Sequence, residues 1–200
     1  MSPKPDVSEE RKHQILDAAM KVFARLGLNK ARMDDIVDEA GMSKGGLYWY
    51  FKSKDEIIYS VLDRMINREL DDFYKNKDKL NTAEEKLYFL VDLIEKDMNV
   101  SQIFSPIMYD IYAFGLRNNS VRKLISISLQ RYFDLLIPII QEGIKNGEFR
   151  SCDPQEAAIA LGGMIEGTIL LKAYQPETVD LSKHIRTGVN FFIQGIKAEV

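Results

Sequence analysis

Basic and aromatic side chains gather in one short stretch of this 200-residue chain, Met33 to Lys54. Three consecutive aromatic residues, Tyr48 to Tyr50, lie between Lys44 and Lys52. Cationic side chains bind phosphates, and aromatic and polar side chains contact base edges, so the pattern indicates nucleic-acid binding. The alternative is that the aromatic residues pack inside a helical bundle. Their periodicity alone leaves both interpretations open.

The same stretch predicts two short helices joined by a glycine turn. The first spans about 33–40 and stops at Gly41, and the second spans about 44–50 with Ser43 as its N-cap. Leu47 and Phe51 are four residues apart and would anchor the second helix to a small core. Two helices in this arrangement fit a helix-turn-helix laid against DNA.

The rest of the chain shows helical periodicity throughout, which predicts an all-α fold of about nine helices. A long fourth helix, opened by a capping box at Ser53, would join an N-terminal head to a C-terminal helical body. The expected domains are 9–69, with the helix-turn-helix at about 32–51, and 70–200. The expected helices are 8–26, 33–40, 44–50, 53–74, 82–99, 103–115, 119–145, 154–173 and 178–197.

Composition narrows the function classes. The net charge is −3, which argues against a general nucleic-acid coat protein. The single cysteine, Cys152, excludes a disulfide framework and fits a reducing cytoplasm. The N-terminus lacks the apolar core of a signal peptide, and Glu166 interrupts the longest apolar run, so a cytoplasmic protein with no membrane span is expected.

An enzyme is the second hypothesis, but no catalytic, metal-binding or cofactor-binding constellation is predicted. His13 and His184 lie in amphipathic helices, and Cys152 lies in a turn. A third hypothesis is a helical interaction module whose aromatic head binds protein instead of DNA. DNA binding with strong salt dependence would separate these possibilities, because phosphate contacts release counterions.

The N-terminal third of the chain, residues 9–69, resembles the DNA-binding domain of the TetR family of bacterial transcriptional regulators. The resemblance implies a homodimer on a pseudo-palindromic operator, one recognition helix per half-site, and a small-molecule effector that releases DNA. The residues that carry it are Arg11, Ile15 to Ala19, Phe23, Gly27, Ile36, Ala40, Gly41, Ser43 to Gly45, Leu47, Tyr48, Tyr50, Phe51, Lys54 and Ile57.

Two positions depart from the family pattern. Arg32 stands where the family usually has a Thr or Ser cap, and its charge could bind a phosphate instead. Gly46 replaces a residue whose side chain often contacts DNA, so base readout would depend more on its neighbours or on DNA shape. The predicted DNA-binding residues are Arg32, Ser43, Lys44, Gly45, Tyr48, Trp49, Tyr50, Lys52 and Lys54, with Tyr48 and Lys54 mainly on phosphates.

The body would hold the effector and the dimer surface. Its aromatic and Met side chains suggest a lipophilic or aromatic effector, although for any single one of them an ordinary core role is the favoured alternative. The dimer would form through about 154–173 and 178–197, with Leu161, Ile165 and Val189 among the residues that supply apolar area. The candidate ligand-binding residues are Phe89, Leu93, Phe104, Met108, Tyr109, Tyr112, Phe133 and Glu166.

Overall fold

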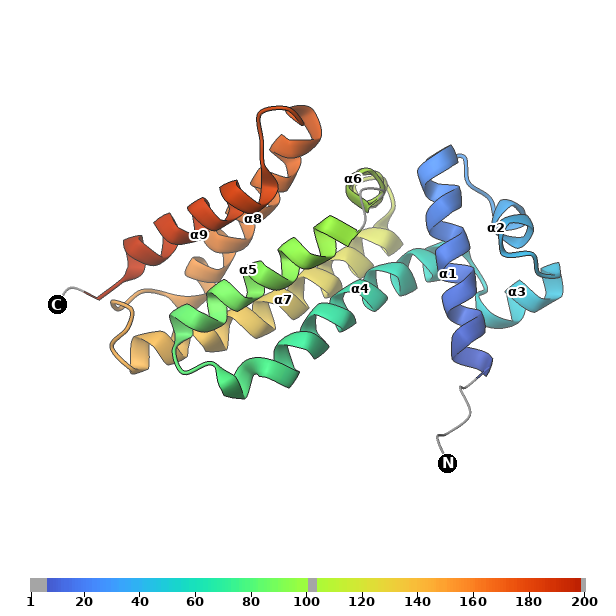
Figure 1. Cartoon of the computed structure of the whole chain (residues 1–200). Coiled ribbons are helices and arrows are strands. Elements are labelled where there is room, and N and C mark those ends of the chain that lie inside the picture. Colours follow the sequence, from blue (N-terminus) through green and yellow to red (C-terminus); the bar gives the residue numbers. More distant parts are fainter. Residues whose placement is uncertain (1–6, 101–103, 199–200) are drawn as a thin grey trace. The chain divides into compact units, whose positions relative to one another are not determined.

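The computed structural model describes residues 7–100 and 104–198, and this part of the chain is all-α, as predicted (Figure 1). Its helix ends agree with the sequence prediction to within a few residues. The nine described helices are α1 (Val7–Leu26), α2 (Met33–Ala40), α3 (Lys44–Tyr50), α4 (Lys54–Asn76), α5 (Ala83–Val100), α6 (Phe104–Gly115), α7 (Asn119–Lys145), α8 (Pro154–Tyr174) and α9 (Leu181–Ile196), with a short 3₁₀ helix at Lys77–Lys79.

The chain forms two compact units, and the polypeptide passes between them three times: within α4, at the start of α6 and within α7. The head unit contains residues 1–65 and 106–128, and the body unit contains residues 66–105 and 129–200. The predicted boundary at 69 and 70 lies close to the division within α4. Sequence reasoning assigned 106–128 to the body, whereas the structure groups this segment with the head.

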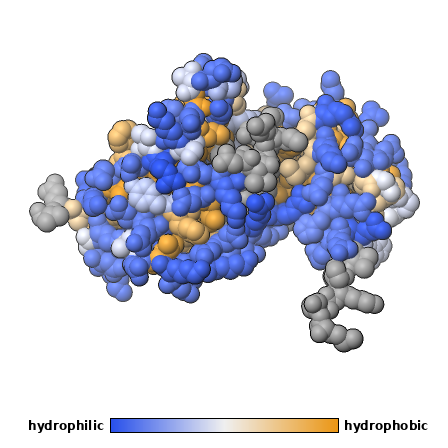
Figure 2. Space-filling view, in the orientation of Figure 1, coloured by the Kyte–Doolittle hydropathy of each residue, from blue (hydrophilic) through white to orange (hydrophobic). Residues whose placement is uncertain are grey.

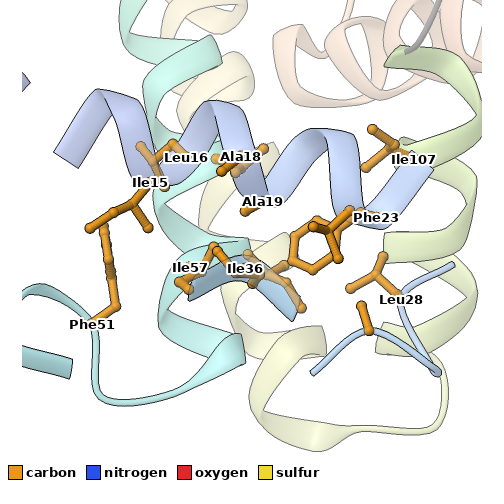
Figure 3. Close-up of a cluster of buried hydrophobic side chains, with 14 of the residues drawn as sticks. Ile15, Leu16, Ala18, Ala19, Phe23, Leu28, Ile36, Phe51, Ile57 and Ile107 are labelled. Carbon is orange, nitrogen blue, oxygen red and sulfur yellow. The ribbon is translucent and has the colours of Figure 1, made fainter. Parts of the chain in front are cut away.

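The head unit has a single apolar core to which six of the described helices contribute, α1 to α4, α6 and the start of α7 (Figure 3). Helix α1 contributes Ile15 and Phe23, and α2 contributes Ile36, and all three side chains are buried. Ile57 of α4 and Ile107 of α6 belong to the same cluster. Because α6 supplies part of this core, the head is larger than the three-helix domain that the sequence predicted.

Local signals set the ends of the short helices in the head. Gly41 has a φ of 61°, a left-handed conformation that ends α2. The Gln14 side-chain amide donates to the Ala40 carbonyl over 2.7 Å, which gives a hydrogen-bond partner to a backbone carbonyl in the last turn of α2. At the start of α2, the Asp35 carboxylate accepts from the Arg32 backbone N–H over 2.7 Å. The Arg32 side chain itself makes no cap.

The body unit is held together at the start of α5 by the turn after α7. The Glu148 carboxylate accepts from the backbone N–H groups of Ala83 and Glu84, which caps α5 from a distant part of the chain. The next residue, Phe149, is buried against Gly143, where a Cβ would lie 2.3 Å from its ring. Gly143 is therefore required by this close packing.

Helix α8 is apolar on most of its circumference but poorly covered by its own chain. By length and composition this one described helix could cross a membrane, and only 17% of that window is buried. Its exposed apolar residues include Leu171 and Tyr174, and Phe191 of the adjoining α9 is 73% exposed. Figure 2 shows apolar side chains among polar ones at the surface over this part of the body unit.

Candidate nucleic-acid interface

Helix α3 is fixed to the head unit by its two predicted anchors. Leu47 is fully buried and Phe51 is 4% exposed, which confirms their structural role. The Ser43 hydroxyl accepts from the Gly46 backbone N–H over 3.1 Å, which confirms Ser43 as the N-cap. With this face buried, the opposite face of α3 is presented to solvent.

The three consecutive aromatic residues have different environments. Trp49 is 68% exposed, and its ring meets the edge of the Tyr50 ring with centroids 4.7 Å apart. Tyr48 and Tyr50 are half-buried and pack against the head core. Packing within the head therefore accounts for the presence of aromatic residues at Tyr48 and Tyr50 in part. It does not account for the exposed aromatic ring of Trp49.

Gly45 lies on the exposed face of α3 with open space around it. A Cβ at this position would have no atom within 4 Å, and the residue does not have a positive φ. Neither internal packing nor backbone conformation therefore requires glycine here. Glycine weakens a helix, and nothing inside the protein requires it here. The missing side chain therefore fits a surface that comes very close to another molecule.

Lys44, the first residue of α3, is paired with Asp34 in the first turn of α2. The ammonium Nζ lies 2.7 Å from one Asp34 carboxylate oxygen and 3.0 Å from the other. The hydrogen bond from Lys44 to Asp34 raises the pKa of Lys44 above its ordinary value. Sequence reasoning missed Asp34, because a separation of ten residues across a turn gives no local signal for a contact.

Two other predicted cations are also exposed. The Lys52 ammonium donates to the carbonyls of Tyr48 and Trp49, so it caps the C-terminal end of α3. The Lys52 and Arg32 side chains are both exposed. Both therefore keep their charge at the surface, and their contacts with DNA remain predictions.

The Lys54 ammonium contacts the loop between α1 and α2. It points into the head unit, where it donates to the Leu28 carbonyl over 2.5 Å and to the Ala31 carbonyl over 3.0 Å. It also lies 5.5 Å from the centroid of the Phe114 ring. Desolvation in this site lowers the pKa of Lys54. The side chain supports the loop between α1 and α2, and its contact with a phosphate remains a prediction.

The same loop has a second polar support that sequence reasoning missed. The Asp110 carboxylate on α6 accepts from the Leu28 backbone N–H over 3.2 Å. Leu28 is thus held at its N–H by α6 and at its carbonyl by α4, while its side chain is buried. These bonds fix the segment that leads into α2, and so they position the helix-turn-helix.

The candidate ligand-binding residues are divided between the two units. Met108, Tyr109 and Tyr112 belong to the head unit, whereas Phe89, Leu93, Phe133 and Glu166 belong to the body unit. Leu93 is 7% exposed and lies in the body core, as expected for an ordinary core residue. The side chain of Phe104 lies outside the described part of the structure. Their role in ligand binding remains a prediction.

The comparisons with known proteins assign both halves of the chain. Residues 15–61 match the family model described as bacterial regulatory proteins of the tetR family. Residues 67–198 match the model described as the C-terminal region of QacR-like proteins. The chain belongs to the TetR family of bacterial transcriptional regulators. The family resemblance of the first third is therefore confirmed, and the second match extends it across the body.

Curated relatives of this TetR-family regulator include several transcriptional regulators. The regulator YvdT of Bacillus subtilis is 30% identical over 72% of both chains. The fatty acid metabolism regulator protein of the same species is 26% identical, over 92% of this chain and 94% of the relative. The regulator QacR of Staphylococcus aureus is 24% identical, over 79% and 84%. This chain is accordingly a ligand-responsive DNA-binding regulator.

Solved structures show the same fold. FadR of Bacillus subtilis in complex with stearoyl-CoA has a TM-score of 0.82 at 24% identity, covering 92% of this chain and 98% of that one. A regulator from Saccharomonospora viridis in complex with choline has a TM-score of 0.79 at 22% identity, covering 96% and 100%. At this sequence identity, the structural similarity establishes only the fold of the regulator.

Proposed function

We propose that this regulator is a repressor that binds a pseudo-palindromic operator as a homodimer, with one α3 helix in each half-site. The observation that supports the proposal is the exposed face of α3, where Lys44, Gly45 and Trp49 point to solvent while Leu47 anchors the helix. The TetR family assignment supplies the class of function. The DNA contacts of Arg32, Ser43, Tyr48, Tyr50 and Lys52 belong to the same proposal.

Fluorescence of the single tryptophan tests the placement of α3. Trp49 is the only tryptophan in the chain, so its emission reports on this surface alone. Titration with operator duplexes recovered by genomic footprinting is expected to change its intensity, because the exposed ring becomes covered. An unchanged emission at saturating operator, with binding verified by gel shift, would contradict the proposed place of Trp49.

The dimer surface in this proposal lies on α8 and α9. Leu171 and Phe191 are 57% and 73% exposed, and apolar side chains of this exposure are often covered in an assembly. The exposed residues differ from those that the sequence suggested. Leu161 and Val189 are buried within the protomer core, so they stabilise the chain itself and are not available to a partner.

Sedimentation with charge substitutions tests this surface. Leu171→Glu and Phe191→Glu are expected to shift the dimer towards monomer at micromolar concentration, because each puts a charge into an apolar interface. Leu116→Glu is the matched control, since Leu116 is 81% exposed on the head unit. A wild-type protein that sediments as a monomer would refute the dimer, and equal effects of all three variants would refute its location.

The effector in this proposal is a lipophilic small molecule that lowers DNA affinity. Aromatic side chains such as Phe89 and Phe133 lie half-buried at the margin of the body core. One relative is a fatty acid metabolism regulator protein, and one similar structure holds stearoyl-CoA. The effector must bind the DNA-free state more tightly than the DNA-bound state, because only differential affinity shifts the equilibrium.

A ligand panel tests the effector class. Stearoyl-CoA, free palmitate, an aromatic cation and choline would each be added to the operator complex, with coenzyme A as the polar control. At least one lipophilic compound is expected to release DNA and to raise the unfolding temperature of the free protein. The proposal fails if only highly polar metabolites do so.

The proposal places the regulator in the cytoplasm, where its operator would be, and gives it no catalytic role. The support is that the curated relatives named above are transcriptional regulators. The apolar surface of α8 is assigned to the dimer and not to a membrane. Fractionation with and without detergent checks this, because a membrane-bound protein would pellet until detergent is added.

A further inference from the structure

An exposed ion pair stands at the edge of the proposed DNA surface. Lys44 and Asp34 join the start of α3 to the start of α2, and each side chain is 64% exposed. Exposed ion pairs of this kind add little to stability. As an acid in the first turn of α2, Asp34 also interacts favourably with the helix dipole, which adds a modest stabilisation. The neighbouring Asp35 has a clear structural task, because it accepts from the Arg32 backbone N–H.

A carboxylate here is unfavourable for a surface that binds only phosphates. Asp34 offsets the charge of Lys44, and a negative group repels the DNA backbone. The pair has a function in DNA binding if the DNA contacts both side chains at once. Lys44 then supplies hydrogen-bond donors, and Asp34 supplies an acceptor beside them.

The major-groove edge of a G·C base pair offers the complement of this pair. Guanine presents two acceptors, N7 and O6, and cytosine presents an N4 amino donor. O6 and N4 are themselves hydrogen-bonded across the base pair, so they lie about 2.9 Å apart. The Lys44 and Asp34 groups are 2.7 Å and 3.0 Å apart, which matches that spacing. An A·T pair also places an acceptor, thymine O4, beside a donor, adenine N6, but it fits less well. It offers the ammonium one acceptor where guanine offers two, and it puts the adenine N7 acceptor beside the carboxylate.

We propose that Asp34 and Lys44 together read one G·C base pair in each operator half-site. The ammonium donates to guanine, and the carboxylate accepts from the amino group of cytosine. The inference rests on the proposed function, since it requires α3 to lie in the major groove. It adds a residue of α2, Asp34, as a determinant of operator specificity.

Selection from random DNA tests this pairing and does not require the operator sequence to be known. The full chain would be used to enrich a duplex library with about 30 random base pairs, a length that spans two half-sites one or two helical turns apart. The variants are Asp34→Ala and Lys44→Met. Asp38→Ala is the matched control, because Asp38 is also an exposed acid on α2. Circular dichroism verifies that each variant is folded.

Wild type and Asp38→Ala are expected to enrich G·C at the same position of each half-site. Asp34→Ala and Lys44→Met should both lose that preference by about five- to a hundredfold and keep the others. Loss at two different positions, or a uniform change in affinity with unchanged preferences, would overturn the inference and leave Asp34 as a repulsive charge only. Enrichment of A·T at the shared position would also overturn it. If wild-type protein enriched no sequence, the proposed function would fail first, and the inference with it.

Discussion

Replacement of Gly45 by alanine separates the stability of the head from its function. The residue lies in the first turn of α3, it does not have a positive φ, and a Cβ there would meet no atom within 4 Å. Alanine removes conformational freedom from the unfolded chain at no cost in native contacts. Gly45→Ala is therefore expected to raise the free energy of unfolding by about 0.4–1 kcal/mol.

The same substitution should weaken operator binding. If α3 approaches the groove closely at Gly45, the added methyl group fills space that the DNA would occupy. A clash or a lost contact of about 1–3 kcal/mol corresponds to a 5- to 150-fold weaker complex. Urea unfolding at a fixed protein concentration measures the first effect, and gel shift with the operator measures the second.

Ser126→Ala provides the control for a general effect of stability. Ser126 is exposed on α7 within the head unit, and alanine there also favours the helix. It should stabilise the head and leave DNA affinity unchanged. If Gly45→Ala bound the operator as tightly as wild type, close approach at this residue would be refuted. If it destabilised the head, the account of open space around Gly45 would be wrong.

Three further variants, with Lys52→Met as the control for the first, test the supports of the head and the body by urea unfolding. Lys54→Met should lower the free energy of unfolding by about 1–3 kcal/mol, because two carbonyls lose a partly buried cationic donor, whereas Lys52→Met should change it by less than about 0.5 kcal/mol. Asp110→Ala should cost about 1 kcal/mol through loss of the bond to the loop after α1, and an unchanged midpoint would remove its positioning role. Gly143→Ala should cost about 1–3 kcal/mol, because the Cβ would lie 2.3 Å from the Phe149 ring; a neutral result would show that the ring can move aside.

The helix ends could be predicted because their signals are local. Ser43 and Asp153 are both N-caps whose side chains accept from backbone N–H groups two or three residues later. Gly27 and Gly41 have positive φ at the ends of α1 and α2. Each of these signals lies within one turn of the helix end that it sets, so a single sequence suffices to find it.

The role of α6 could not be predicted, because it depends on contacts between distant segments. Ile107 and Ile111 fit an amphipathic helix whichever core they enter, and the structure places both in the head. The same limit applies to Lys54, which looks like a phosphate-binding cation at a helix start. Its long side chain reaches back to Leu28 and Ala31, and nothing in the local pattern specifies that direction.

The exposed face of α8 could not be predicted from the sequence either. The helix is apolar on nearly all sides, so its periodicity does not show which side enters the protomer core. Leu161 proved to be buried, whereas Ile159 and Leu171 are exposed. The predicted segment for the dimer is unchanged, but the residues proposed to carry it are different.

The dependence of operator affinity on salt tests the central proposal, that the head binds DNA, most directly. Arg32, Lys44 and Lys52 are exposed in each head, and two heads would place four to six of them on phosphates, depending on whether Lys44 contacts a base. Since each phosphate contact contributes about −0.9, the slope of log K against log salt should lie between about −3.6 and −5.4. A slope near zero, or equal affinity for operator and unrelated duplexes at every salt concentration, would contradict the account.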